Sequence, residues 1–154
     1  MLRFTTGNIL DSSAEALVNT VNTVGVMGKG IALQFKQAFP YNYNIYRQTC
    51  LHGQSKTGQV LAVKDSELLF GERLIINFPT KQHWKLPSQY DFVESGLIAL
   101  VSYLRHNPVK SIAMPALGCG NGGLDWNKVK PLIERYLSNM DISIWVYEPI
   151  FKAT

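Results

Sequence analysis

The stretch Asn19-Thr-Val-Asn-Thr-Val-Gly-Val-Met-Gly-Lys-Gly-Ile-Ala32 decides the fold of this chain. It begins in an apolar run typical of a buried strand, passes through a glycine-rich loop and leads into a segment with helical periodicity. This order is typical of phosphate-binding sites, because glycine lets backbone N–H groups approach an anion and the helix N-terminus adds partial positive charge.

A second segment, Ser111-Ile-Ala-Met-Pro-Ala-Leu-Gly-Cys-Gly-Asn-Gly-Gly123, repeats the same order. One such loop alone would favour the simpler interpretation that its glycines only serve tight turns. Two loops in equivalent strand-to-helix positions instead predict a clamp on one pyrophosphate.

Neither loop matches a standard nucleotide motif. In the first loop, Gly28-Lys29 is followed by Gly30 where a P-loop requires Ser or Thr. The spacing of Gly25, Gly28 and Gly30 is also the reverse of the dinucleotide fingerprint. The loops therefore do not favour a nicotinamide-dinucleotide oxidoreductase.

Composition indicates one folded globular domain of 154 residues, 46% hydrophobic and 17% charged. The net charge of +4 suits an anionic ligand, although the positive residues are scattered and form no cluster typical of a nucleic-acid-binding protein. Cys50 and Cys119 are too few for a disulfide framework. With no signal peptide and no run long enough to span a bilayer, we expect a cytoplasmic location.

Hydrophobic patterning predicts alternating strands and helices. Strands are expected at 2–6, 16–21, 59–63, 74–78, 110–114 and 143–147, with helices at 31–39, 41–52 and 126–140. A further helix is expected to run to His106 from an N-cap in Ser88-Gln-Tyr-Asp91, and Asp125 is expected to cap the last helix. The alternation predicts a three-layer α/β/α domain with a largely parallel sheet, whose ligands bind at the carboxyl ends of the strands.

The chain resembles the macrodomain family, whose members bind ADP-ribose and in many branches hydrolyse its linkages. The resemblance extends along essentially the whole chain, so it implies a single macrodomain over 1–154, with a mixed six-stranded sheet between helices. The motifs that carry it are Thr5-Thr-Gly-Asn-Ile-Leu10, Ala16-Leu-Val-Asn-Thr-Val-Asn22, Gly25-Val-Met-Gly-Lys-Gly-Ile-Ala32, the Leu117-Gly-Cys-Gly loop and Val146-Tyr-Glu-Pro149.

Two segments, Asn77-Phe-Pro-Thr-Lys-Gln-His-Trp84 and Gly118-Cys-Gly-Asn-Gly-Gly-Leu-Asp-Trp126, most resemble the DarG antitoxin branch. That branch removes ADP-ribose from thymidine in DNA and reverses a DarT-like ADP-ribosyltransferase toxin. The resemblance therefore implies ADP-ribose and ADP-ribosylated DNA as ligands and such a toxin as a partner. DarG proteins usually carry a further C-terminal region, so we expect this chain to be an excised domain or a stand-alone relative.

Two positions depart from the wider family. Many macrodomains carry an Asp that binds the adenine amino group where this chain has Asn8, whose amide oxygen can still accept that hydrogen bond. The related protein glycohydrolase, which cleaves ADP-ribose esters on glutamate, has an Asp in the second loop where Gly122 stands here. The nearest acid, Asp125, is better explained as a helix cap. The missing acid favours the DNA-directed branch over the protein-directed one.

The resemblance makes Lys81 the predicted catalytic residue, whereas its position alone would favour a solvated surface lysine. It follows an apolar strand on the side where the ligand should lie, and an amine can break a glycosidic bond through a Schiff base. A lysine must lose its proton to attack, which partial burial or a nearby cation such as Lys85 or His83 would favour. Its presence argues against a third alternative, a non-catalytic reader of ADP-ribose.

The resemblance implies that ADP-ribose binds to residues from both loops and both ends of the chain. Asn22 is expected to orient the distal ribose, although a turn-forming role after its strand is equally consistent with the sequence, and Asn19 is expected to be structural. Tyr147 and Phe151 are expected beside the adenine, or packed at the edge of the core. The full expected set is Asn8, Ile9, Asn22, Gly28, Lys29, Gly30, Leu117, Gly118, Cys119, Gly120, Asn121, Gly122 and Tyr147.

Three residues after Lys81 receive secondary roles. His83 is a candidate to assist proton transfer, and Trp84 and Lys85 are candidates to contact the DNA strand. The histidines show no metal-binding spacing, so we expect neither metal nor cofactor. Cys119 lacks a histidine to activate it and is expected to serve as a small loop residue.

Overall fold

The computed structural model describes residues 1–150 of the chain, which form one sheet with helices on both faces. The strands are β1 (Leu2–Thr5), β2 (Ala16–Asn22), β3 (Leu61–Glu67), β4 (Gly71–Lys81), β5 (Ser111–Pro115) and β6 (Ser143–Tyr147). The helices are η1 (Ile9–Asp11), α1 (Gly30–Ala38), α2 (Pro40–Leu51), α3 (Tyr90–His106) and α4 (Trp126–Leu137).

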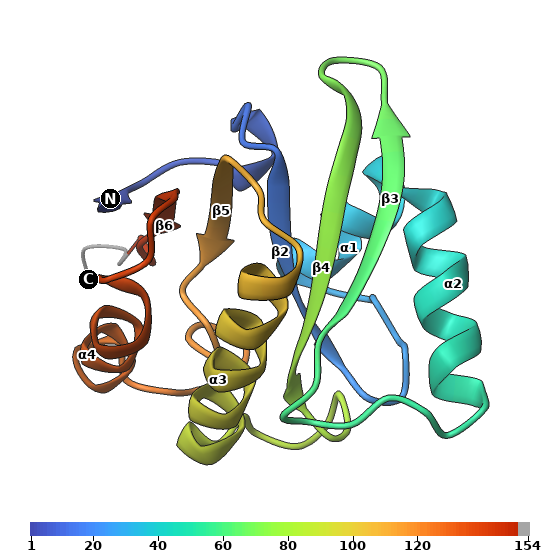
Figure 1. The fold of residues 1–154 in the computed structure, drawn as a ribbon. Coiled ribbons are helices and arrows are strands. Elements are labelled where there is room, and N and C mark those ends of the chain that lie inside the picture. Colours follow the sequence, from blue (N-terminus) through green and yellow to red (C-terminus); the bar gives the residue numbers. More distant parts are fainter. Residues whose placement is uncertain (151–154) are drawn as a thin grey trace.

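The six strands lie in the order β1-β6-β5-β2-β4-β3. All neighbours are parallel except the edge strand β3, which runs antiparallel to β4. Helices α1 and α2 cover one face of the sheet and α3 and α4 cover the other (Figure 1). The predicted three-layer α/β/α fold with a mixed, largely parallel sheet is therefore confirmed.

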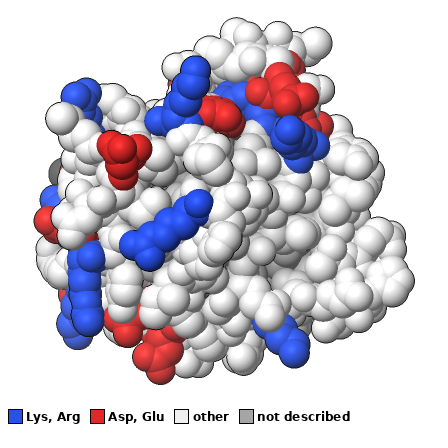
Figure 2. Space-filling model, in the orientation of Figure 1, with Lys and Arg blue, Asp and Glu red and all other residues white. Residues whose placement is uncertain are grey.

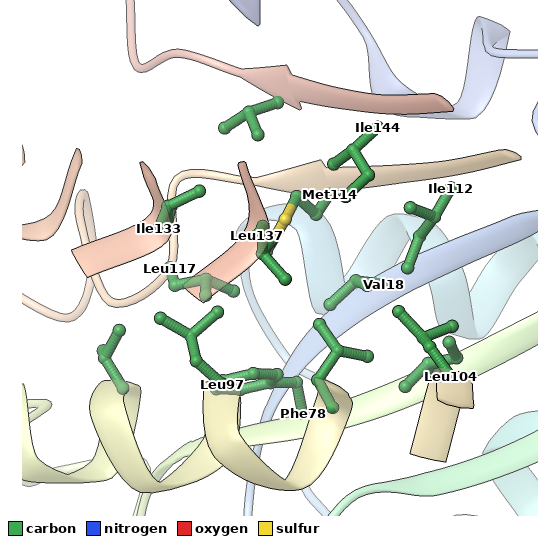
Figure 3. Close-up of a cluster of buried hydrophobic side chains, with 14 of the residues drawn as sticks. Val18, Phe78, Leu97, Leu104, Ile112, Met114, Leu117, Ile133, Leu137 and Ile144 are labelled. Carbon is green, nitrogen blue, oxygen red and sulfur yellow. The ribbon is translucent and has the colours of Figure 1, made fainter. Parts of the chain in front are cut away.

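Most of the hydrophobic core lies between the sheet and the α3–α4 layer (Figure 3). Phe78 of β4 and Leu97 of α3 are fully buried there, together with Ile133 of α4. On the opposite face, Phe35 of α1 and Tyr46 of α2 fill smaller clusters. Burying these apolar side chains on both faces holds the parallel strands rigidly, and so fixes the edge at which they end.

The β3–β4 hairpin is longer than its apolar runs predict. Polar residues such as Lys64 and Asp65 continue β3, since an edge strand tolerates solvent on one side and the ladder with β4 satisfies its backbone. The longer β4 carries the chain as far as Lys81, three residues beyond the predicted end. Lys81 is therefore held by the sheet and does not lie in a loop.

The helix ends show how local sequence sets the boundaries. Pro40 begins α2 at a position where its missing N–H costs nothing, and the Asp125 side chain accepts from Asn127 N–H at the start of α4, as predicted. Helix α3 begins after Gln89, which makes no side-chain cap bond, while Ser88 turns into the interior.

Buried side-chain amides connect the sheet to helix α2 beneath the strand ends. Asn77 of β4 donates to Asn42 of α2 at 2.8 Å and accepts from it at 3.1 Å, and Asn19 of β2 lies 3.5 Å from Asn77. All three side chains are fully buried. Asn19 therefore lies within the fold, which agrees with the structural role expected of it.

Charged side chains are dispersed over the face that Figure 2 shows, where lysines and arginines alternate with acids and uncharged residues. Within residues 1–150, no helix is both long enough and apolar enough to cross a bilayer.

Candidate functional site

A cavity of about 850 Å³ opens at the carboxyl ends of β2, β4, β5 and β6, where the sequence predicts the ligand site. This volume is within the range of small-molecule sites. Both glycine-rich loops line it. Of the predicted ligand-binding residues, its lining contains Ile9, Asn22, Gly28, Lys29, Gly30, Gly118, Cys119, Gly120, Asn121, Gly122 and Tyr147, and it also contains Lys81 and Trp84.

The first loop is shaped by Asn22 at the end of β2. The Asn22 side-chain oxygen accepts from the N–H groups of Val24, Gly25 and Val26 at 2.9 to 3.2 Å, while its amide donates to the Val26 carbonyl at 2.8 Å. Asn22 therefore forms the turn, one of the two roles left open by the sequence, and it also lines the cavity. Its contact with the distal ribose stays a prediction.

Helix α1 begins beside this turn with an uncapped N-terminus. Lys29 occupies the N-cap position in extended conformation and its side chain makes no cap hydrogen bond. Within residues 1–150, no side chain is hydrogen-bonded to the first N–H groups of this helix, which carry the partial positive charge of the helix N-terminus at the wall of the cavity. This arrangement suits a phosphate.

The second loop packs tightly on itself and against Ser88. Gly118 has a φ of +72°, which favours glycine, and a Cβ on Gly122 would lie 2.2 Å from the Gly118 carbonyl oxygen. The Ser88 N–H donates to the Gly122 carbonyl at 3.0 Å, and the buried Ser88 Oγ has no hydrogen-bond partner among the described residues. Gly118, Gly120 and Gly122 of this loop line the cavity and carry no side chains, so a ligand can approach their backbone closely.

The two loops meet across the cavity. A Cβ on Gly30 would lie 3.0 Å from the Asn121 side-chain nitrogen, so the first loop and the second are in near contact. This is the placement that a clamp on one diphosphate requires.

Lys81 joins the second loop to the sheet. Its Nζ donates to the Asn121 carbonyl at 2.9 Å, and its side chain is partly buried. At the end of β4 it is paired with Asn22 of β2, across a register shift between Val21 and Asn22. The irregular pairing brings the amine of Lys81 and the turn of Asn22 to the same wall of the cavity.

The cavity also has polar lining residues that sequence reasoning missed, including Thr20, Gln34, Thr80 and Glu148. Glu148 Oε2 accepts from the Trp126 indole at 2.9 Å and from Lys130 at 3.4 Å, so two donors from α4 hold the carboxylate. Its position directly after the last parallel strand, within the motif Val146-Tyr-Glu-Pro149, is the signal in the sequence that was available for it.

Four predicted residues do not line the cavity. Leu117 is fully buried in the core, where it supports the second loop from behind. Asn8 is exposed between the lining residues Gly7 and Ile9, and its side chain caps η1 by accepting from Leu10 N–H at 3.0 Å. His83 and Lys85 lie outside the lining and flank Trp84: the imidazole stacks on the indole, and Lys85 Nζ lies 5.0 Å from its centroid. Phe151, expected beside the adenine, lies outside the described residues.

Cys119 is chemically quiet. Burial, together with the nearby Asp125 carboxylate, raises the pKa of its thiol to about 11, so that little thiolate exists near neutral pH. Among residues 1–150, no cluster of His, Cys, Asp and Glu side chains is arranged to hold a metal ion.

Comparison with known proteins places this geometry in a family. Residues 18–133 match the Macro domain model. The chain is 53% identical over 151 residues to a DNA ADP-ribosyl glycohydrolase of Thermus aquaticus, a match that covers 97% of the chain and 42% of the relative. A DNA ADP-ribosyl transferase–DNA ADP-ribosyl glycohydrolase fusion protein of Thermosipho africanus is 38% identical over 160 residues, covering 95% of the chain and 41% of the fusion protein. The chain thus spans about two fifths of the length of these relatives.

Solved structures agree with the sequence matches. The macrodomain of Thermus aquaticus DarG superposes with a TM-score of 0.90 at 52% identity, covering 97% of this chain and 99% of that one. Thermosipho africanus DarTG in complex with ADP-ribose superposes with a TM-score of 0.92 at 37% identity, covering 99% of this chain and 43% of that one. The chain belongs to the macrodomain family and is similar to DarG macrodomains along nearly its whole length.

Proposed function

We propose that this macrodomain binds ADP-ribose in the cavity and removes it from thymidine in DNA, thereby reversing a DarT-like ADP-ribosyltransferase. The proposal is supported by the name of the Thermus relative, a DNA ADP-ribosyl glycohydrolase, and by the fusion of the two activities in the Thermosipho relative. The cytoplasm, where bacterial DNA lies, is the expected place of action.

In the proposed complex the diphosphate lies between the two loops. The N-terminus of α1 and the backbone of 118–122 supply N–H groups to its oxygens, and Lys29 adds positive charge. The adenosine half lies toward Ile9 and Tyr147, and Asn8 at that end accepts a hydrogen bond from the adenine amino group. The distal ribose then lies at the wall formed by Asn22 and Lys81.

Lys81 acts as the nucleophile in the proposed reaction. Its neutral amine forms a bond to the anomeric carbon of the distal ribose as the bond to the thymidine nitrogen breaks, and that nitrogen takes a proton. Opening of the ribose ring gives an imine with Lys81. Water then adds to the imine carbon, which releases ADP-ribose and restores the amine. His83, at the outer rim, is a candidate to assist the proton transfers.

The position of Lys81 is the observation that carries the proposal. It is an amine in the wall of an ADP-ribose-sized cavity, fixed at 2.9 Å from the Asn121 carbonyl of the loop that would hold the diphosphate. The hydrogen bond to the Asn121 carbonyl orients Lys81 Nζ. This bond can break when bound substrate replaces the carbonyl as the partner of the amine.

Replacing Lys81 by Ala tests this role. We expect Lys81→Ala to abolish release of ADP-ribose from an ADP-ribosylated thymidine oligonucleotide and to leave the Kd for ADP-ribose within about threefold, because the amine serves the reaction more than the binding. Lys29→Ala, at the other lysine of the cavity wall, is the matched control and should weaken binding while turnover persists at saturating substrate. Borohydride added during turnover should leave a covalent adduct on Lys81.

Near-normal turnover by Lys81→Ala would rule out catalysis by this amine. A large loss of affinity with unchanged saturated turnover would instead make Lys81 a binding residue.

A further inference from the structure

Helix α2 packs against the first loop and donates hydrogen bonds to it. The Tyr46 hydroxyl lies 2.8 Å from the Asn22 carbonyl oxygen, and Arg47 Nη1 donates to the Val24 carbonyl at 2.7 Å. Gly25 lies so close to α2 that a Cβ there would be 3.1 Å from the Cβ of Cys50. Asn22, Val24 and Gly25 are thus each in contact with one helix.

The same segment is bonded on its other side to the end of β4. Thr23 N–H donates to the Lys81 carbonyl at 3.0 Å, and the Thr23 hydroxyl donates to the Gln82 carbonyl at 2.8 Å. A continuous path of hydrogen bonds and peptide units therefore runs from α2 through Asn22 and Thr23 to the backbone of Lys81.

The direction of the bonds at Tyr46 follows from their chemistry. A carbonyl oxygen only accepts, so the single Tyr46 hydroxyl proton is committed to Asn22, and Ser55 Oγ at 2.8 Å must donate to the Tyr46 oxygen. Burial raises the pKa of Tyr46 above its ordinary value, which keeps this proton in place. The Gly25 N–H also donates to the Asn22 carbonyl, at a long 3.4 Å.

We infer that Tyr46 is a positioning residue for the reaction, holding segment 22–26 and, through Thr23, the backbone of Lys81 against α2. The inference rests on the proposed function of Lys81. Tyr46 is 1% exposed and packs with Val21 and Met27, so its ring is fixed and its hydroxyl can act as a rigid anchor. The diphosphate grip at the second loop does not pass through this path, so ligand affinity and turnover should respond differently to its loss.

Tyr46→Phe tests the anchor, because it removes the hydroxyl and keeps the packed ring. We expect kcat on the modified oligonucleotide to fall by about tenfold, as for a misplaced reacting group, while the Kd for ADP-ribose changes by less than about threefold. Tyr43→Phe is the matched control: it lies on the same helix with its ring against Lys36, and its hydroxyl makes no hydrogen bond within residues 1–150. This control should leave kcat and Kd unchanged.

A second pair of variants examines the far end of the path. Thr23→Val removes the hydroxyl that reaches Gln82 and should lower kcat in the same way, whereas Thr23→Ser keeps the hydroxyl and should restore it. A similar loss in both Thr23 variants would count against the hydrogen-bonded path.

Amide hydrogen exchange separates this inference from the proposed function, since it needs no turnover. In Tyr46→Phe the amides of 23–26 should exchange faster while those of the second loop keep their protection. Unchanged exchange in that segment, or a kcat loss matched by an equal loss of ADP-ribose affinity, would overturn the positioning role. A wild-type protein that released no ADP-ribose would overturn the proposed function and the catalytic part of this inference, and exchange would still report whether Tyr46 holds the segment.

Discussion

Gly122 lies close to both Gly118 and Ser88 beneath the site. A Cβ on Gly122 would lie 2.4 Å from Ser88 Oγ as well as 2.2 Å from the Gly118 carbonyl oxygen, so no larger residue fits without displacing backbone. The absent second-loop acid of the protein-directed branch therefore coincides with a place where this loop has no room for one. Gly122 therefore decides both the shape of the loop and which side chain this position can carry.

Gly122→Ala should weaken ADP-ribose binding by at least about tenfold, because the methyl group must push the second loop out of its place beneath the diphosphate. Gly28→Ala is the control for folding: a Cβ there would lie 3.7 Å from the nearest atom, an ordinary contact. Calorimetric titration with ADP-ribose and thermal melting of both variants measure the effect. Unchanged affinity in Gly122→Ala would show that the ligand does not depend on this backbone.

Cys119 should react slowly with thiol reagents. With its pKa raised from about 9 to about 11, the thiolate fraction at pH 8 is about a hundredfold below that of an unperturbed thiol. Alkylation followed by mass spectrometry should show that rate difference, with a free thiol as reference. The Cys119 thiol ionises at lower pH in the unfolded chain than in the folded protein. This group therefore lowers the stability of the fold as the pH rises from about 9 to about 11. Rapid alkylation at pH 8 would contradict the burial of the thiol.

At the scale of elements, strand β4 links the core to the chemistry. Apolar patterns in the sequence predict the six strands and the four α-helices but not the short η1, because each of the longer elements buries an apolar face in the core. The same signal ends at Phe78, so it misses the last three residues of β4, including Lys81. Pairing with β2 extends the strand to Lys81, and that pairing depends on a segment distant in sequence.

The site divides in a similar way. Its glycine-rich loops can be identified from the sequence, because close backbone approach requires glycine. Lys81 is singled out by the family resemblance, and its catalytic role stays a prediction. Ser88, Thr80 and Glu148 carry no such signal. Their places beside the loops and the cavity arise from tertiary contacts, such as the bond from Ser88 N–H to Gly122 and that from the Trp126 indole to Glu148.

The segment after β4 is suited to contact a DNA strand outside the cavity. Trp84 is 46% exposed at the cavity rim, and Lys85 lies over its ring. Lys85→Glu and Trp84→Ala should reduce turnover on a modified oligonucleotide more than on the modified mononucleoside, because only the oligonucleotide offers flanking phosphates and bases. The slope of log affinity against log salt should become shallower by about 0.7 in Lys85→Glu.

Lys64→Glu on the edge strand β3 makes the same change of charge opposite Leu74, far along the ladder from Lys81, and should affect both substrates equally. If the Trp84 and Lys85 variants also lost activity equally on the two substrates, these residues would shape the cavity and would not contact the strand.

At the scale of the whole molecule, charge and architecture favour a selective pocket over a broad DNA-binding surface. The net charge is only +4, and lysines and arginines are mixed with acids on the face shown in Figure 2. DNA should therefore be recognised mainly through the ADP-ribose it carries, with few phosphate contacts. The cavity at the carboxyl edge of the sheet, lined by two glycine-rich loops and by Lys81, is the candidate site for this recognition.

The most direct test of the proposed DNA-directed activity is the release of free ADP-ribose by the wild-type protein from two substrates at equal concentration. One is a single-stranded oligonucleotide carrying ADP-ribose on thymidine, and the other is a protein carrying ADP-ribose on glutamate. We expect the wild-type protein to release ADP-ribose faster from the oligonucleotide, and we expect Lys81→Ala to release none from it. Faster release from the protein would move the chain to the protein-directed branch, and release from neither, with ADP-ribose still bound, would make it a reader.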